Sequence, residues 1–438
     1  MFQANMIVYQ LALRTMTPEG TLQAATKMLP HIASLGVDIV YVCPFFVEEN
    51  DEDLSTWSPR QLASQTCNPK NPYKIADYFN IDEEYGTKED LRDFVRAAHE
   101  NGLLVLFDLV YFHCAKTAVF LKEHPDFVEH EADGSLTIGK KWPFAKINFQ
   151  NPELREYLKL HMKTMLLEYH ADGFRCDVGD KVPFDFWVES FAYCKAEKPD
   201  FISLNEGRAA AAIDGVFDMS YAPEWNDYMI DVFAKGEPVE KLRERHSFER
   251  EKYGANMIKL IRTIDTHDVA SDCGLDRNEI TMGARGVEAA LVVTNTFEGV
   301  PFLWNGYEIC DNAENNMFSN RFYGKRGEIN WSRGFTEDGK RRMAFIREIH
   351  QLHHQNSAIG MGTMEWIDNT QSDAIVSYVK SYKNERVLVL VNSKNKPICA
   401  EIAKQYNDLT PLMSYGIDRE NAKFSFAPYG YIIAEIND

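Results

Sequence analysis

Short apolar runs alternate along the chain with longer segments of helical period. Leu103–Val110 is a nearly continuous apolar run, as expected of a strand buried on both faces. Asn151-Pro152 opens a segment whose apolar positions recur at helical spacing up to Tyr169, which predicts a helix. The order of strand and then helix repeats from residue 6 to residue 354, which favours a parallel sheet covered by helices.

Eight strands can be identified in this pattern, so a (β/α)₈ TIM barrel is a more economical prediction than a doubly wound sheet. The predicted strands are Met6–Leu13, Val37–Val42, Leu103–Val110, Gly173–Asp177, Phe201–Asn205, Gly215–Met219, Lys259–Asp265 and Val300–Trp304. Predicted helices include Thr21–Leu35, interrupted at Pro30, one capped by Thr87 with Asp90 at its third position, Phe184–Ala196, Asn226–Arg245, Gly286–Thr296 and Arg341–His354.

Two segments depart from the barrel pattern. Residues 114–148, after the third strand, are too long for a simple loop and predict a small excursion domain. After about residue 356 short alternating strands take over, and Ile375–Tyr382 and Arg386–Asn392 predict a hairpin around Lys383-Asn384-Glu385. We therefore expect an α/β fold with a barrel (1–113 and 149–355), an excursion domain (114–148) and a C-terminal all-β domain, a β-sandwich (356–438).

Composition narrows the classes of partner. The 438 residues carry 66 acidic against 47 basic side chains, a net charge of −19. Nucleic acids and anionic membranes both require a positive surface, so we expect neither as a partner. A hydrophobic content of 45% argues against disorder. These features fit a protein with a neutral or cationic ligand.

The sequence also predicts a compartment. The N-terminus has no basic segment, no long apolar stretch and no small-residue cleavage site, and no apolar run reaches the length of a membrane span. The eight cysteines are scattered without a CxxC pair, as expected of reduced thiols. We therefore expect a cytoplasmic protein, either a monomer or a homodimer.

Polar residues are concentrated where four predicted strands end, which is where barrels carry their reactive groups. Like charges raise one another's pKa, so this many carboxylates in one mouth point to a function. The third strand contributes Asp108 and His113, the fourth Arg175 and Asp177, the fifth Glu206, and the seventh His267 and Asp268.

Two of these carboxylates differ in their sequence surroundings. Arg175 lies two residues before Asp177 and therefore on the same strand face, which predicts an ionised nucleophile. Glu206 has no basic neighbour before Arg208, which favours a protonated acid. Such a pair fits retaining glycoside hydrolysis. A divalent metal site is the alternative for Asp, Glu and His in one mouth, but Arg175 would repel the cation.

These strand ends resemble the α-amylase family, glycoside hydrolase family 13. The stretch Gly36–Pro44 is similar to the second-strand motif of the family, and Gly299–Glu308 to its eighth-strand motif. Tyr73–Tyr78 through Tyr85-Gly86-Thr87 is similar to the segment before its second helix. Together with the four strand ends, the resemblance extends over nearly the whole chain.

The resemblance implies a role for each matching residue. Asp177 matches the nucleophile, Glu206 the general acid/base and Asp268 the carboxylate that stabilises the transition state. The resemblance also implies that Arg175 orients the nucleophile and that Asp108 is structural. His113, His267 and Tyr73 match residues that bind the sugar at the cleavage site.

Three departures from the family pattern carry further expectations. Phe112 replaces an asparagine that commonly serves the family's calcium site, and phenylalanine offers no oxygen ligand, so we expect no metal there and no cofactor. Ala145–Asn148 resembles neopullulanase and cyclomaltodextrinase relatives, which often carry an N-terminal dimerising domain that is not seen before residue 6. Asp177–Lys181 lacks the Lys-His pair of many α-amylases. Lys181 or Asp180 is a candidate for the acceptor side, although solvated charges at a helix start explain both equally well.

The leading hypothesis is therefore a retaining hydrolase of α-glucosidic bonds in malto- or isomalto-oligosaccharides, with an α-linked gluco-oligosaccharide as the substrate. A glucanotransferase or a sugar isomerase would use the same triad of carboxylates. A catalytically silent relative would be expected to lack a triad member and to have a membrane segment, and neither is seen. Linkage, chain length and exo or endo action are left open.

Overall fold

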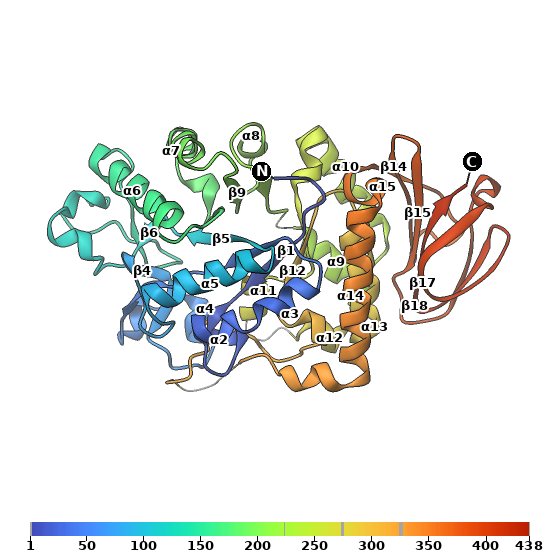
Figure 1. The fold of residues 1–438 in the computed structure, drawn as a ribbon, viewed down its shortest axis with the longest axis horizontal. Helices are drawn as coiled ribbons and strands as arrows, with labels where there is room; N and C mark the ends of the chain where they lie inside the picture. The colour runs from blue at the N-terminus through green and yellow to red at the C-terminus, as the bar shows by residue number, and fades with distance from the viewer. Residues whose placement is uncertain (1, 223, 273–275, 324–326, 438) are drawn as a thin grey trace.

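A computed structural model of the chain describes residues 2–222, 224–272, 276–323 and 327–437. A parallel barrel with helices around it occupies most of the molecule, and the C-terminal strands lie at one end of its long axis (Figure 1). The predicted TIM barrel is thereby confirmed. Within the described ranges its strands are β1 (Val8–Leu11), β2 (Ile39–Val42), β5 (Leu104–Leu109), β8 (Gly173–Cys176), β9 (Ile202–Asn205), β10 (Met219–Ser220), β11 (Ile261–Arg262) and β12 (Val300–Trp304).

The barrel strands pair in the order β10-β9-β8-β5-β2-β1-β12-β11, and each pair is parallel. A parallel bridge between Ser220 and Leu260 joins the two outer strands. The sheet is thus closed, with β10 and β11 meeting at a narrow seam. Closure brings the carboxyl ends of all these strands to one mouth.

Helix ends follow the capping signals in the sequence. Thr87 and Asp90 form a reciprocal capping box at the start of α5, and the Asn151 side chain accepts hydrogen bonds from two backbone N–H groups of α6. The helices are α1 (Leu13–Met16), α2 (Leu22–Thr26), α3 (Leu29–Ser34), α4 (Pro59–Ala63), α5 (Lys88–Glu100), α6 (Pro152–Glu168), α7 (Phe184–Glu197), α8 (Ala210–Ile213), α9 (Trp225–Phe233), α10 (Glu240–Tyr253), α11 (His267–Ser271), α12 (Asn278–Thr281), α13 (Gly283–Thr296), α14 (Glu337–Gln355) and α15 (Ser357–Met361).

Two predicted helices are each divided in the structure. Asn226–Arg245 was predicted as one helix, but α9 and α10 are separated by a segment that contains Gly236 and Pro238. Proline disfavours helical geometry at the residue before it, so the helix ends ahead of Gly236-Glu237-Pro238. Thr21–Leu35 is likewise divided into α2 and α3, with Pro30 in the first turn of α3.

The connection between β2 and α5 contains an antiparallel ribbon that the sequence pattern does not reveal. It consists of β3 (Phe46–Asn50) and β4 (Lys70–Ile81), with register shifts along the pair. Arg14 secures the ribbon to the barrel, since its guanidinium contacts the Glu48 carboxylate at 3.0 Å and the Glu84 carboxylate at 2.8 Å. The ribbon carries Tyr73 to the barrel mouth.

The segment after β5 forms a small lobe at the end of the molecule opposite the C-terminal strands (Figure 1). It contains the short antiparallel pair β6 (His113–Cys114) and β7 (Ala145–Lys146). Two 3₁₀ helices, η2 (Val119–Lys122) and η3 (Pro125–Phe127), lie between these strands. Isolated bridges such as Val128 to Ile147 hold the lobe together.

The C-terminal strands form one antiparallel sheet of six strands in the described residues. β14 and β15 make the predicted hairpin, but Glu385 pairs with Tyr382, so the turn contains Lys383 and Asn384 alone. Lys383 has a φ of +52°, as a tight hairpin turn requires. The strands are β13 (Thr363–Trp366), β14 (Ile375–Tyr382), β15 (Glu385–Asn392), β16 (Ile398–Glu401), β17 (Leu409–Glu420) and β18 (Lys423–Ile436).

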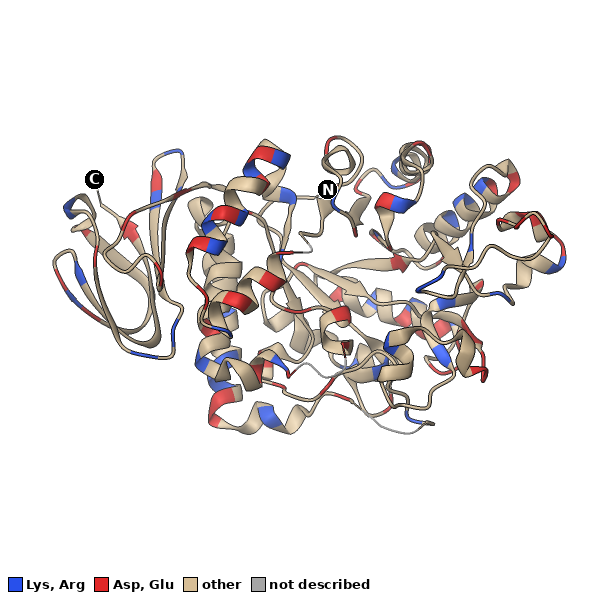
Figure 2. Ribbon diagram, turned by 180° about the vertical axis from the view of Figure 1, so that it is seen from behind, with Lys and Arg blue, Asp and Glu red and all other residues tan. Residues whose placement is uncertain are grey.

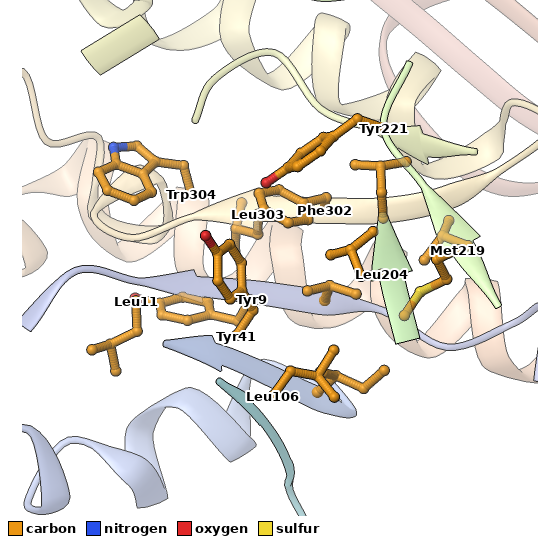
Figure 3. Close-up of a cluster of buried hydrophobic side chains, with 14 of the residues drawn as sticks. Tyr9, Leu11, Tyr41, Leu106, Leu204, Met219, Tyr221, Phe302, Leu303 and Trp304 are labelled. Carbon is orange, nitrogen blue, oxygen red and sulfur yellow. The ribbon is translucent and has the colours of Figure 1, made fainter. Parts of the chain in front are cut away.

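The barrel interior is aromatic near its mouth. Figure 3 shows buried side chains from β1, β2, β9 and β12 gathered in one cluster. The ring of Tyr41 lies 6.3 Å from that of Phe302, which in turn lies 6.0 Å from the ring of Tyr221. The guanidinium of Arg175 lies over Tyr41 and Tyr221, at 5.6 and 5.7 Å from their ring centres. Packing of these rings therefore fixes the position of a buried cation.

Acidic and basic positions are interspersed over both the barrel and the C-terminal strands in the view of Figure 2. The net charge of −19 is thus not gathered on one element. In the part of the chain that the structure describes, no helix combines the length and the apolar character needed to cross a membrane. The seven cysteines that the structure describes are free thiols, and Cys273 lies outside the described residues.

Candidate active site

Arg175 brings three of the predicted carboxylates together. Its Nη1 donates hydrogen bonds to both oxygens of Asp108, at 2.7 and 2.9 Å, and to Asp177 Oδ1 at 2.9 Å. Its Nη2 lies 2.8 Å from Glu206 Oε2. Asp108 lies on β5, whereas Asp177 and Glu206 directly follow β8 and β9. One fully buried cation therefore holds carboxyl groups from three adjacent strand ends.

The electrostatics of this group differ from the sequence-based prediction. Burial raises the pKa of Asp177 well above its usual range, and the Glu206 and Asp108 carboxylates raise it further, although Arg175 lowers it. The predicted contact between Arg175 and Asp177 is confirmed, but its effect on the Asp177 pKa is opposed by burial and by two further acids that face the same cation. Glu206 has no basic neighbour along the sequence before Arg208, yet Arg175 reaches its carboxylate from the adjacent strand.

A hydrogen-bonded relay links Asp108 to the end of β11. The backbone N–H of His267 donates to Gln10 Oε1 at 3.2 Å, so the amide nitrogen of Gln10 faces His267 Nδ1, at 2.6 Å. Nδ1 must then accept, and the ring proton lies on Nε2, which is 2.7 Å from the Tyr73 hydroxyl. Tyr73 donates to Asp108 Oδ2 at 3.0 Å. The relay fixes the tautomer of His267 and the direction of every bond in it.

Both histidines at the mouth are neutral at pH 7. Burial lowers the pKa of His267 to about 4, and burial likewise lowers the pKa of His113 to about 4. His113 Nε2 lies 2.9 Å from the Tyr73 carbonyl oxygen, which can only accept, so that nitrogen carries the proton. A neutral imidazole can bind a sugar hydroxyl without bringing a charge into the pocket.

Asp268 has a partner that no sequence motif indicated. Arg60, on α4, pairs with Asp268 through Nη1 and with Asp272 Oδ1 through Nε at 2.6 Å. The Arg60 guanidinium also lies 5.5 Å from the ring centre of Trp142. Burial alone would raise the pKa of Asp268, but His267, which is protonated at the acidic pH where Asp268 titrates, and Arg60 lower it overall. Arg60 lies on α4 in the long connection between β2 and α5, far in sequence from Asp268, and its position at the mouth of the barrel is evident only from the folded structure.

A cavity of about 350 Å³ opens at this end of the barrel. It is within the size range of small-molecule sites, and its walls combine carboxylates with aromatic rings. Asp108 and Arg175 lie beneath it, fully buried. Lys181 is exposed at the end of the 3₁₀ helix η4 (Gly179–Lys181) and does not line the cavity. The lining includes the predicted residues Tyr73, His113, Asp177, Glu206, His267 and Asp268, together with Arg60, Phe112, Trp142 and Phe144.

Phe112 presents its side chain to the cavity. In the described ranges no three His, Cys, Asp or Glu side chains are grouped so that they could hold a metal ion. The absence of the calcium site that Phe112 suggests stays a prediction, as does the absence of a cofactor.

Comparison with known proteins gives concordant results. Residues 6–133 match the family model described as alpha amylase, catalytic domain. A cyclomaltodextrinase from a Bacillus species is 24% identical over 85% of this chain and 66% of its own length. The alpha-amylase MalA of Haloarcula japonica is 25% identical over 89% of this chain and 56% of its own length.

A solved structure extends the likeness to the fold of the whole chain. The noncanonic maltogenic alpha-amylase AmyB of Thermotoga neapolitana superimposes with a TM-score of 0.81 at 22% identity, and the match covers 99% of both chains. The match covers only part of the curated relatives: 66% of the length of the first and 56% of the length of the second. Over residues 6–133 this chain thus matches the catalytic-domain model of the α-amylase family, and over most of its length it is similar in sequence to proteins named cyclomaltodextrinase and alpha-amylase.

Proposed function

We propose that the protein is a retaining glycoside hydrolase that cleaves α-glucosidic bonds in malto- or isomalto-oligosaccharides. The observation that supports this most directly is the placement of Asp177 and Glu206 on the two terminal nitrogens of one guanidinium, that of Arg175. Retaining enzymes need their two carboxyl groups close together, without room for a water between acid and nucleophile. Two carboxyl groups that share one guanidinium meet that requirement.

Asp177 acts in this proposal as the nucleophile. Its carboxylate attacks the anomeric carbon while Glu206 gives its proton to the departing glycosidic oxygen, which leaves a glycosyl ester on Asp177. Glu206, now ionised, takes a proton from water, and the resulting hydroxide equivalent attacks the same carbon and releases Asp177. Two inversions at one carbon retain its configuration.

Asp268 and the histidines bind the sugar at the cleavage site. The lowered pKa of Asp268 keeps it ionised at neutral pH, so it can accept sugar hydroxyls and stabilise positive charge that develops on the ring. His113 and His267, being neutral, act as hydrogen-bonding groups. Tyr73 offers its ring to a pyranose face. The neutral sugar needs no steering by the net charge of −19.

The names of the relatives support an α-glucan as the substrate. They include cyclomaltodextrinase and maltogenic alpha-amylase, and a solved neighbour, AmyP, is in complex with maltotriose. A relative from Bacillus subtilis is named intracellular maltogenic amylase, which supports the cytoplasmic location that we propose. Because this chain spans only part of the length of those relatives, the main support for the activity is the geometry of the site.

Time-resolved product analysis tests this proposal. The wild-type protein is incubated with maltotriose, isomaltose, sucrose, trehalose and starch, and ¹H NMR follows the first product formed. We expect α-configured products from at least one substrate and a loss of activity of roughly 10⁴-fold or more in Asp177→Ala. A matched control is Asp185→Ala, an exposed acid that pairs with Arg155 on the barrel surface.

Each result bears on a different part of the proposal. A β-configured first product would refute the double displacement. Activity retained in Asp177→Ala would remove Asp177 as the nucleophile. New glucosidic bonds formed faster than free sugar would replace the hydrolase by a glucanotransferase, and an isomerised disaccharide would replace it by a sugar isomerase.

A further inference from the structure

The segment that carries Glu206 is bonded to Asp180, a carboxylate outside the cavity. Asp180 Oδ1 accepts a hydrogen bond from Asn205 Nδ2 at 3.0 Å. Asp180 Oδ2 accepts from the backbone N–H of Arg208 and, at 2.8 Å, from that of Ala209. One half-buried side chain therefore receives three hydrogen bonds from residues on both sides of Glu206.

Further contacts join the same two connections. The backbone N–H of Val178 donates to Glu206 Oε2 at 2.9 Å, and Val178 has a φ of +43°, which a β-branched residue rarely adopts. Gly207 lies so close to Asp180 that a Cβ there would stand 2.1 Å from Asp180 Oδ1. The segment after Asp177 and the segment around Glu206 are thus packed directly against each other.

Asp180 does not line the cavity, so it acts on a substrate only through the segment that it holds. That segment begins at the end of β9 and has few regular backbone bonds of its own before α8. Without the Asp180 carboxylate, two backbone N–H groups lose their acceptor, and the Asn205 amide loses one of two, since it also donates to Ser220 Oγ at 3.2 Å. Glu206 itself would keep its contacts with Arg175, with the N–H of Val178 and, through its own N–H, with the Cys176 carbonyl oxygen at 3.1 Å, but the residues after it would have lost two backbone hydrogen bonds.

We propose that Asp180 is a positioning residue for Glu206: it fixes the segment 205–209 so that the carboxyl group stays at the leaving-group side of the bond to be cleaved. The inference rests on the proposed function of Glu206 as the acid. It makes a specific demand on kcat/KM, which reports formation of the glycosyl ester: a misplaced acid slows that step only where the leaving group needs a proton. A general loss of structure would harm all substrates alike.

Two substrates with different leaving groups test the inference in the whole 438-residue chain. When maltose is cleaved, the oxygen of the departing glucose must be protonated, whereas α-glucosyl fluoride releases fluoride with little help from an acid. In Asp180→Ala we expect kcat/KM for maltose to fall roughly 10²-fold, within the range of general acid catalysis. For α-glucosyl fluoride we expect a fall of less than about fivefold, because Asp177 keeps its own contacts with Arg175.

Conservative and opposing substitutions sharpen the test. Asp180→Asn keeps an oxygen that can accept from both backbone N–H groups, so it should restore most of the maltose activity. Gly207→Ala should mimic Asp180→Ala, because its new Cβ would displace the same segment. In the double variant the Asp180 carboxylate no longer clashes with the new Cβ at residue 207. Gly207→Ala should therefore lower kcat/KM for maltose less in that background than in the wild-type protein. Asp185→Ala serves as the control.

The outcomes separate the inference from the proposed function. If the wild-type protein cleaves neither of these two substrates and no member of the substrate panel above, the proposed function fails. If it cleaves both, and Asp180→Ala lowers both kcat/KM values by the same factor, Asp180 is merely structural and the inference is overturned. The inference would also be overturned if the double variant lost as much kcat/KM for maltose as the separate losses of Asp180→Ala and Gly207→Ala multiplied together. Circular dichroism and the urea midpoint of each variant establish that it is folded before its kinetics are compared.

Discussion

At the scale of single residues, the site depends on the charge of Arg175. Its guanidinium is fully buried and faces Asp108, Asp177 and Glu206, so ionisation of all three acids would leave an excess of buried negative charge. Burial raises the pKa of Asp177, and the excess of negative charge raises it further. The pKa of Asp108 is raised by burial as well, so these two buried acids, which share one guanidinium, titrate together rather than singly.

This arrangement predicts a pH dependence of activity. A nucleophilic Asp177 must be ionised, so kcat/KM falls as the pH drops through its pKa. Because that pKa is raised, the acid limb should lie well above the value of about 3.9 for an ordinary aspartate. The measurement is kcat/KM against pH with α-glucosyl fluoride, which reports the free enzyme. An acid limb below about pH 4 would contradict the prediction.

Glu206→Gln provides the matched variant for this experiment. The substitution preserves the size of the side chain and removes a negative charge that raises the pKa of Asp177. The acid limb with α-glucosyl fluoride should therefore move to lower pH. Lys181→Gln changes an exposed charge outside the cavity and should leave the limb in place.

Residue-level prediction from the sequence succeeded where a residue follows a strand. Asp177, Glu206 and Asp268 could be placed in one mouth, because parallel strands end at the same edge of a barrel. Arg60 and Gln10 could not. Arg60 reaches Asp268 from a connection whose path depends on the β3–β4 ribbon, and Gln10 reaches His267 across the barrel. Contacts of that kind appear only once the fold is known.

At the scale of elements, the eight barrel strands were predictable because largely apolar segments recur between stretches of helical period, although β10 and β11 have only two residues each and include Ser220 and Arg262. The ribbon after β2 was not, since β4 mixes charged and aromatic residues from Lys70 to Ile81 without strict alternation. The division of Asn226–Arg245 was signalled by Gly236 and Pro238. Those two residues outweigh the helical period on either side.

The capping box of α5 gives a testable prediction at this scale. Asp90 N donates to Thr87 Oγ1 at 3.2 Å and Thr87 N to Asp90 Oδ2 at 2.8 Å. Thr87→Ala removes the hydroxyl that accepts from Asp90 N, so we expect a loss of about 1 kcal/mol in the free energy of unfolding. Urea denaturation followed by circular dichroism measures it. Thr87→Ser keeps the hydroxyl, and an equal loss in that variant would contradict the role of the cap.

At the scale of the whole molecule, the C-terminal sheet is bonded to the barrel through Glu298, which lies just before β12. Its carboxylate accepts hydrogen bonds from Met364 N at 2.7 Å and from His246 Nε2 at 2.9 Å. Trp366 Nε1 donates to His246 Nδ1 at 3.0 Å, which makes His246 a bridge between the two parts. We infer that barrel and sheet unfold together.

Glu298→Ala tests this coupling. The change leaves the Met364 and His246 donors without an acceptor in a buried place, so we expect a loss of roughly 1–3 kcal/mol. Burial opposes ionisation of Glu298, but the bonds from His246 and Met364 lower its pKa overall. Its contribution is therefore present above the pKa of an unfolded glutamate and is lost as the pH falls through the lower pKa of the folded state.

Urea unfolding at pH 7, followed by tryptophan fluorescence, measures the loss. The control is Glu365→Ala, which removes an exposed acid from β13. Wild-type unfolding in two separate steps would contradict the inferred coupling. An equal loss in both variants would show that Glu298 has no special part in it.

The narrow seam between β10 and β11 has a consequence for how the residues after it are held. These strands have two residues each and meet at the bridge from Ser220 to Leu260. His267 and Asp268 follow the seam, yet Gln10 and Arg60 hold them from elsewhere. Two short strands at the seam thus add little to the placement of His267 and Asp268, whose side chains depend on Gln10 from β1 and on Arg60 from α4.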